Sequence, residues 1–196
     1  TTPTIGSPSP FPSGSGDEGW VRLDNGVNLD GWVHNGGGVF QVVDGYIQLT
    51  QNGTAGGYLR STSTFSNFEI KYDVWVDWGC DSGIILRTNT TGDKGYQICS
   101  DMQNASSIGG IYGSKLGAFK SYNFVFDGSE SKIKSYEGKS PVSFPLNEWP
   151  MVWTVNNWNT VRAVISGNPP EIRVFINENE AHYYKEETAL QTNDGG

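Results

Sequence analysis

The stretch Phe68-Glu-Ile-Lys-Tyr-Asp-Val-Trp-Val76 decides the fold class, because every even-numbered position in it is apolar. Successive side chains of an extended strand point to opposite faces, so the even positions share one apolar face. Glu69, Lys71, Asp73 and Trp75 share the other face. This alternation predicts an antiparallel strand with one face on a hydrophobic core and the other turned away from it.

Short runs separated by turn residues continue this pattern along the chain. The runs Val39–Val43 and Tyr46–Thr50 are separated only by Asp44-Gly45, which predicts a hairpin with a two-residue turn. Two more hairpins are predicted, from 83–87 with 95–99 and from 161–166 with 171–176. No stretch has a sustained apolar period of 3.6 residues, so the sequence predicts an all-β fold, an antiparallel β-sandwich.

The composition limits the partners of the chain. Its 196 residues include 13 lysines and arginines against 21 aspartates and glutamates, a formal net charge of −8. An acidic chain lacks the electrostatic attraction to phosphates on which nucleic-acid binding depends. No run approaches the roughly 18 consecutive apolar residues of a membrane-spanning helix. We therefore expect neither nucleic acid nor a membrane as a partner.

Residues 1–16 are mainly Thr, Ser, Pro and Gly, which predicts an arm or linker before a single domain over 17–196. The chain begins at Thr1 without a signal stretch, as a processed chain or an excised domain would. Three N-glycosylation sequons begin at Asn52, Asn89 and Asn104. These features favour a secreted, extracellular glycoprotein.

The two cysteines bracket one of the predicted hairpins. Cys80 and Cys99 are almost equidistant from its turn near Asn89. Cross-strand neighbours can reach the Cα separation of about 5.5 Å that a disulfide needs. A disulfide closing this loop stabilises a fold by roughly 3 kcal/mol. We expect this disulfide, with a bulge at 81–83 to bring the two side chains to one face, and two free thiols as the alternative.

The sequence shows no motif for a metal or a cofactor. Its two histidines, His34 and His182, have no metal-ligand spacing around them. Acidic turns at Asp24-Asn25 and Asp30 could hold calcium, although such turns are usually only solvated. A nucleophile elbow, a phosphate loop and a dinucleotide fingerprint are all absent from the sequence. We expect no resident cofactor or metal, with calcium as the alternative.

Carboxylates and aromatic residues are the remaining candidates for chemistry. Glu69 and Asp73 share one strand face about 13 Å apart, too far for a glycosidase carboxylate pair. A catalytic pair therefore needs a carboxylate from another strand, and a solvated outer face is the simpler alternative. Indole and phenol rings can stack on sugar C–H groups. The aromatic residues in excess of one core are Trp75, Trp78, Tyr112, Tyr122, Trp149, Trp153 and Trp158.

Several motifs follow one another in a characteristic order. They are Gly19-Trp-Val-Arg-Leu-Asp-Asn-Gly26, Asn28-Leu-Asp-Gly-Trp32, Phe40-Gln-Val-Val-Asp-Gly45, Phe65-Ser-Asn-Phe-Glu-Ile70, Asp81-Ser-Gly-Ile-Ile-Leu-Arg87, Gly95-Tyr-Gln-Ile98, Gly110-Ile-Tyr-Gly113 and Val174-Phe-Ile-Asn177. In this order they resemble the 3-keto-disaccharide hydrolase domain family over residues 20–190. No single motif is specific, but the ordered series is.

The resemblance implies a concanavalin A-like, laminarinase-type jelly roll that is secreted, acts on carbohydrate and holds its ligand on a concave sheet. Matching positions place Glu69, Asp73, Arg87 and Tyr112 on this sheet, with Glu69 and Asp73 as the candidate catalytic residues. The candidate ligand-binding residues are Arg87, Gln97, Tyr112 and Trp75.

The sequence departs from the family pattern in three places. Gln97 stands where the family has a glutamate, and an amide cannot give or take a proton. Residues 114–157 form a longer insertion than the family usually carries. The chain stops at 190–196, about where the family enters its last strand. A missing strand leaves a sheet edge unpaired and favours self-association by strand addition.

Three functions follow from these patterns. The first is a glycoside hydrolase-like enzyme for disaccharide-type or oxidised glucosides. The second is a carbohydrate-binding module that lost its chemistry at Gln97. The third is a glycosylated structural subunit of an extracellular filament or assembly, completed by a strand from a neighbouring chain. The sequence alone does not decide whether the chain is an enzyme.

Overall fold

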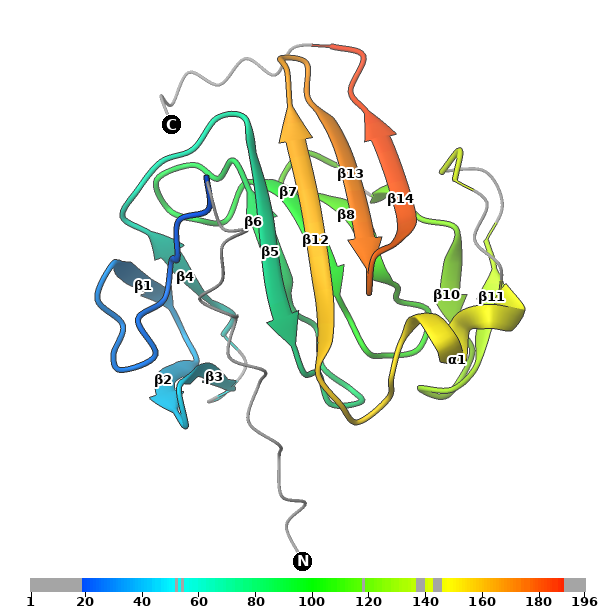
Figure 1. Ribbon diagram of the computed structural model, residues 1–196, viewed down its shortest axis with the longest axis horizontal. Helices are drawn as coiled ribbons and strands as arrows, with labels where there is room; N and C mark the ends of the chain where they lie inside the picture. The colour runs from blue at the N-terminus through cyan, green and yellow to red at the C-terminus, as the bar shows by residue number, and fades with distance from the viewer. Residues whose placement is uncertain are drawn as a thin grey trace, which may run out of the picture. The chain divides into compact units, whose positions relative to one another are not determined.

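The computed structural model describes residues 19–51, 53, 55–117, 119–136, 140–142 and 146–188. The chain divides into two compact units, residues 1–64 and 65–196 (Figure 1). The predicted arm at 1–16 lies outside the described residues. Among the described residues, no helix has the length and apolar character needed to cross a membrane.

The first unit contains two small antiparallel pairs. Strand β1 (Trp32–Gly36) pairs with β4 (Gly57–Ser61), and β2 (Val39–Val43) pairs with β3 (Tyr46–Thr50). Asp44 and Gly45 connect β2 to β3 with φ angles of 49° and 86°. A type I′ hairpin turn needs positive φ at both central residues, which Asp-Gly supplies at little cost. The predicted hairpin is confirmed.

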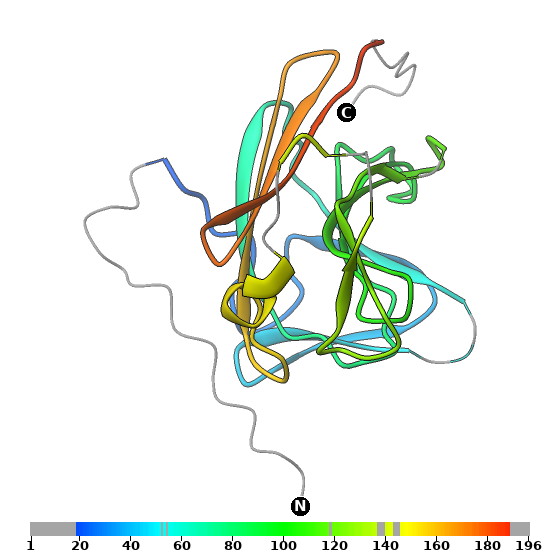
Figure 2. The same cartoon turned by 90° about the vertical axis from the view of Figure 1, so that its right-hand side faces the viewer.

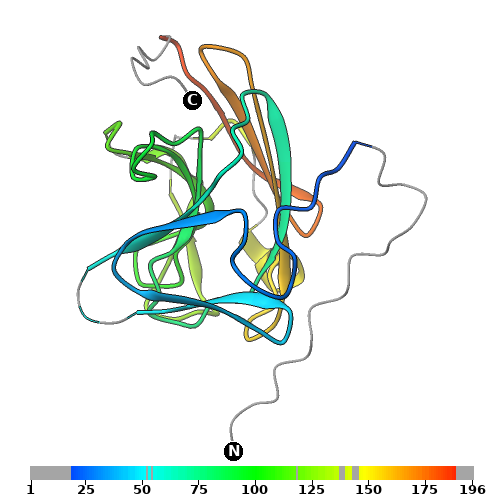
Figure 3. The ribbon, with the colours of Figure 1, turned by 90° about the vertical axis from the view of Figure 1, so that its left-hand side faces the viewer.

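The second unit contains two four-stranded antiparallel sheets. Its elements are β5 (Phe68–Val74), β6 (Gly83–Leu86), β7 (Gly95–Ser100), β8 (Ile108–Ser114), β9 (Phe119–Ser121), β10 (Phe124–Phe126), β11 (Ile133–Ser135), η1 (Leu146–Glu148), α1 (Trp149–Val152), β12 (Asn159–Ser166), β13 (Glu171–Ile176) and β14 (Asn179–Lys185). One sheet has the strand order β14-β13-β12-β5, and the other has the order β6-β7-β8-β9. Figures 2 and 3 show these two sheets as separate layers of the unit. The predicted all-β sandwich is confirmed.

The core between the two sheets follows the period of two. Phe68, Ile70, Tyr72 and Val74 of β5 all pack against it, as the alternation predicts. The buried residues that meet there are Val161, Ala163, Ile165, Ile172 and Val174 from one sheet and Leu86, Tyr96, Ile98 and Ile111 from the other. The side chains between these positions therefore point away from the core on each sheet.

A second cluster contains four of the eight aromatic residues in the expected insertion at 114–157. Phe124, Phe126, Trp149 and Trp153 are each at most 2% exposed. The rings of Trp149 and Trp153 stack at 6.0 Å, and Phe124 lies 5.0 Å from Trp149. These rings fill a core of their own around β10 and α1, so they do not face a sugar.

The predicted disulfide is wrong, because Cys80 and Cys99 are both free thiols. The strand register gives the reason. Cys99 lies opposite Gly83 in the β6–β7 pair. The same register places Cys80 opposite Met102. Cys80 is thus three residues away from the position opposite Cys99, and it is exposed whereas Cys99 is buried.

Strand β14 is the outer strand of its sheet, and side chains from other elements occupy its outward backbone groups. Ser121 Oγ donates to the Tyr183 carbonyl at 2.8 Å, and Asn123 Nδ2 donates to the Ala181 carbonyl at 2.8 Å. The Tyr183 amide donates to Ser140 Oγ at 3.4 Å. The last strand expected near 190–196 lies outside the described residues. Self-association through a sheet edge stays a prediction.

His182 of β14 is completely buried and neutral. Its Nε2 bonds to the Ile108 carbonyl at 3.1 Å. Gly109, with a φ of 73°, leaves room for the ring, since a Cβ there would lie 3.1 Å from His182 Cδ2. Burial lowers the pKa of His182 from 6.5 to about 4, partly opposed by the bond to Ile108. The folded protein therefore resists protonation that the unfolded chain accepts near pH 6.5.

His182 is expected to make the protein sensitive to acid. Its folded pKa is depressed, so its contribution to stability is lost as the pH falls from 6.5 to about 4. At roughly 1.4 kcal/mol per pH unit, the wild type should lose about 3 kcal/mol more than His182→Gln over this range. Urea unfolding at several pH values measures the difference. Substitution of the exposed His34 by glutamine is the matched control, and an equal pH slope in wild type and His182→Gln would contradict the assignment.

Candidate functional site

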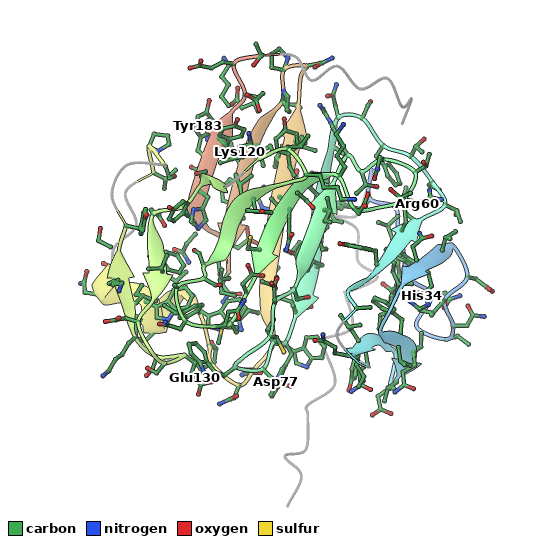
Figure 4. The ribbon with its side chains drawn as sticks, turned by 180° about the vertical axis from the view of Figure 1, so that it is seen from behind. His34, Arg60, Asp77, Lys120, Glu130 and Tyr183 are labelled. Atoms are coloured by element: carbon green, nitrogen blue, oxygen red, sulfur yellow. The ribbon has the colours of Figure 1, made fainter. Side chains whose placement is uncertain are left out.

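The outward face of the β6–β9 sheet carries two of the predicted ligand-binding residues. Gln97 of β7 lies directly between Ile85 of β6 and Tyr112 of β8 in the strand register. Their neighbours Tyr96, Ile98 and Ile111 fill the core, so Gln97 and Tyr112 point the other way. Both are partly exposed. Figure 4 shows this sheet from its outward side.

A buried aspartate, Asp101, lies just after the end of β7, the strand that carries Gln97. Asp101 is 7% exposed, and its Oδ1 accepts a hydrogen bond from the Ser82 amide at 3.0 Å. The carbonyl of the same Ser82 accepts a bond from Gln97 Nε2 at 3.2 Å. One residue of the β5–β6 connection therefore ties the Gln97 amide to the Asp101 carboxyl.

Asp81 and Asp101 form a carboxylate pair. Burial, followed by the negative charge of Asp81, raises the pKa of Asp101 to about 7. The hydrogen bond from the Ser82 amide acts in the opposite direction, and the two carboxyl groups are hydrogen-bonded to each other. Asp101 therefore keeps its proton to a higher pH than an ordinary carboxyl group does. Asp81 is exposed, so the pair presents one carboxylate to solvent and keeps its proton on the buried partner.

Cys99 lies beside this pair but is not a nucleophile. Its side chain is 1% exposed and hydrogen-bonded to Asp101. Burial, reinforced by the charge of Asp101, raises the pKa of the Cys99 thiol far above its usual range. The thiol therefore stays protonated, and only a thiolate attacks or binds metal effectively.

The structure separates the other predicted residues from this face. Glu69, Asp73 and Trp75 lie along β5 and just beyond it, on the outward side of the opposite sheet. Glu69 accepts from Arg162 Nη1 at 2.9 Å, and Asp73 accepts from Thr160 Oγ1 at 2.6 Å. The expectation that one sheet carries Glu69, Asp73 and Tyr112 together is wrong, because β5 and β8 belong to different layers.

Arg87 joins turns at one end of the sandwich. It follows β6 with a φ of 50°. Its guanidinium donates to the Ser66 carbonyl at 2.6 Å, the Gly167 carbonyl at 2.7 Å and Asn67 Oδ1 at 2.9 Å. Asn67 Oδ1 also accepts from the Gly167 amide at 2.9 Å. These contacts occupy the guanidinium of the predicted ligand-binding arginine with the protein's own turns.

Arg87→Ala is therefore expected to reduce stability rather than sugar affinity. Removing three charge-assisted hydrogen bonds from a partly exposed site should cost about 2 kcal/mol. Urea unfolding and calorimetric titration with a sugar measure the two effects separately. Arg87→Lys, which keeps the charge without the planar fork, should recover only part of the stability. A weaker affinity for the sugar at unchanged stability would restore the ligand-binding role.

The three sequons fall in different environments. Asn52 lies outside the described residues. The Asn89 amide group donates to Thr91 Oγ1 and Asp93 Oδ1, while its oxygen accepts from three backbone amides at 92–94. Asn104 is exposed and accepts from the Gly128 amide at 2.9 Å. A glycan on Asn89 would disturb a filled hydrogen-bond set, so Asn104 is the better acceptor of these two.

Within the described part of the chain, no three potential metal-ligating side chains gather at one place. In the acidic turns considered for calcium, Asn28 accepts from Asn25 Nδ2 and donates to Asp30 Oδ2. Calcium binding at these turns stays an untested alternative.

Sequence reasoning missed Asp81 and Asp101 as site residues. Asp81 opens the motif Asp81-Ser-Gly-Ile-Ile-Leu-Arg87, and Asp101 follows β7 by one residue. The sequence did offer one signal, because a carboxylate stands next to the same end of each of the two paired strands β6 and β7. The break in register between Ile98 and Ser100 was not visible in the sequence.

The comparison with known families supports the resemblance seen in the motifs. The model described as the 3-keto-alpha-glucoside-1,2-lyase-like domain matches residues 19–195. Among curated proteins, none matches the chain at a significant level.

Proposed function

Because the chain belongs to the 3-keto-alpha-glucoside-1,2-lyase-like domain family, we propose that it cleaves 3-keto-glucosides by elimination across C1 and C2. The reaction takes place on the outward face of the β6–β9 sheet. The carboxylate pair of Asp81 and Asp101 beside Gln97 is the observation that carries this proposal.

The elimination needs a base that removes the C2 proton and a hydrogen-bond donor that stabilises the negative charge on the C3 oxygen. A keto group at C3 makes the proton on C2 acidic, and the exposed Asp81 carboxylate removes that proton. The electron pair of the C2–H bond forms the C1=C2 bond as the C1–O bond breaks. The leaving oxygen then takes a proton from water, and the hydroxide that remains takes the proton from Asp81 and regenerates the base. The products are a 1,2-unsaturated 3-keto sugar and a free alcohol.

Gln97 and Asp101 support this step without exchanging protons with the substrate. One N–H of the Gln97 amide is bonded to Ser82, and the other can stabilise the negative charge that develops on the C3 oxygen. In this mechanism a glutamine is suitable where the family pattern has a glutamate. Asp101 is a positioning residue, because its proton holds the Asp81 carboxylate in place.

The test uses p-nitrophenyl 3-keto-α-glucoside deuterated at C2. Elimination releases nitrophenol, loses the deuterium to water and gives a product with a C1=C2 bond in its NMR spectrum. Hydrolysis would retain the deuterium and give the free keto sugar. The unoxidised p-nitrophenyl α-glucoside is the control, because its C2 proton is not acidic. Absence of elimination from the wild type would overturn the proposal.

A carbohydrate-binding module without catalysis is the second candidate. The observation that favours it is Gln97, whose amide cannot act as an acid or a base. This function requires binding of the keto-glucoside by calorimetry together with no release of nitrophenol.

The proposed setting of either function is extracellular. Its support is the Thr, Ser and Pro content of residues 1–16 and the exposed sequon at Asn104. Recovery of the native chain from culture medium, with a mass change on glycosidase treatment, tests the location and the glycosylation together.

A further inference from the structure

We propose a second carbohydrate-binding surface on the outward face of the β14-β13-β12-β5 sheet. Its parts are the side chains of Trp75, Trp158, Asp73 and Thr160, which we call the indole platform. It lies on a different sheet from Asp81 and Gln97. The inference rests on the proposed function only in the choice of a gluco-oligosaccharide as its ligand.

The strand register brings the two indoles together. Asp73 lies opposite Thr160 and Val74 lies opposite Asn159 in the β5–β12 pair. The next step of this register places Trp75 opposite Trp158. Their ring centroids are 6.2 Å apart with planes at 76°. Both rings are partly exposed, and perpendicular rings cannot cover each other face to face.

A carboxylate stands one step along the same face. Asp73 Oδ1 accepts from Thr160 Oγ1 at 2.6 Å, which fixes the carboxylate in place. Alternate residues of a strand are about 7 Å apart, a distance that one sugar unit spans. An indole for the C–H groups and a carboxylate for the hydroxyls match a glucose ring.

The charged side chains on the adjoining part of this face pair with one another. The indole platform is therefore limited to the end of the sheet at Trp75 and Trp158. Lys71 Nζ pairs with Glu178 at 3.0 Å. Arg162 pairs with Glu69 at 2.9 Å and with Glu178 at 3.6 Å. The Arg162 guanidinium also lies 3.7 Å from the centroid of the Phe175 ring. Phe175 is thus covered by a side chain of the protein and serves as a matched aromatic control.

The experiment is isothermal titration of the full chain with maltohexaose and cellohexaose. We expect at least one of them to bind the wild type, and Trp158→Ala to weaken that binding at least tenfold. Trp158→Phe should recover part of the affinity, and Phe175→Ala should leave it unchanged. Asp73→Ala is expected to weaken binding at least tenfold without removing a ring from the fold.

The catalytic readout separates this inference from the proposed function. Trp158→Ala should leave the turnover of the small p-nitrophenyl substrate unchanged, whereas Asp81→Asn should abolish turnover and leave hexaose binding intact. Failure of the wild type to bind either hexaose would overturn the platform, whatever the turnover. Unchanged affinity in both Asp73→Ala and Trp158→Phe would overturn it as well.

Discussion

Asp81→Asn is expected to lower kcat/KM for elimination of the 3-keto-glucoside by about 10³-fold. Asparagine keeps the shape of the side chain but cannot take the C2 proton, and general base catalysis typically contributes about 10²–10⁴-fold. Single-turnover release of nitrophenol measures the loss. Because Asp81 is exposed, the substitution should leave the midpoint of urea unfolding near that of the wild type.

Two controls sharpen this result. Asp77→Asn changes another exposed carboxylate of the same connection, labelled in Figure 4, and should leave the rate unchanged. Glu69→Gln removes a carboxylate of the opposite sheet, which pairs with Arg162, and should also be silent. If Glu69→Gln lost tenfold or more of kcat/KM while Asp81→Asn kept full activity, the catalytic carboxylate would lie on the outward face of β5 instead.

The pH profile reports on Asp101. The activity of the wild type should fall above pH 7, because Asp101 then loses its proton and its carboxylate repels that of Asp81. The asparagine side chain in Asp101→Asn cannot ionise, so the fall in activity above pH 7 should disappear. An activity that rises through the same range would mean that Asp101 acts as the base itself.

Trp149→Ala is expected to destabilise the protein by about 3–5 kcal/mol, the range for deleting a large buried aromatic ring. Trp149 is 2% exposed and stacks on Trp153 at 6.0 Å, in contact with Phe124 and Phe126. Urea unfolding measures the change in free energy. The other side of the same short helix supplies the control, since Met151 is 80% exposed and Met151→Ala should change stability by less than about 0.5 kcal/mol. Equal effects of the two substitutions would contradict a separate aromatic core.

Much of the fold could be predicted because it depends on local chemistry. The alternation in residues 68–74 fixes which side chains enter the core, and the structure confirms it at Phe68, Ile70 and Tyr72. Asp44-Gly45 specifies its own turn through positive φ. These properties involve residues that are neighbours in sequence, so no knowledge of the layers was needed.

The candidate site could be predicted only in part, because it depends on which strand belongs to which sheet. Gln97 and Tyr112 lie together as expected, but Glu69 and Asp73 lie on the other layer. The alternation of apolar and polar residues shows which side chains of a strand point outward, but it does not show to which sheet the strand belongs. Predicting the position of Asp101 would have required the irregular register after Ile98. Predicting the free thiol of Cys80 would have required its pairing with Met102. Long-range register of this kind is not encoded in residue spacing.

The hydrogen bonds from Ser121 and Asn123 to β14 have a consequence for folding. Ser121 ends a strand of one sheet and Asn123 follows it, while the carbonyls that they reach belong to the other sheet. The edge of β14 is therefore protected only after the two layers have docked. A chain with its sheets formed but not yet docked exposes an open strand to other copies, which is an aggregation hazard. The time between sheet formation and docking should set the yield of refolding at high protein concentration.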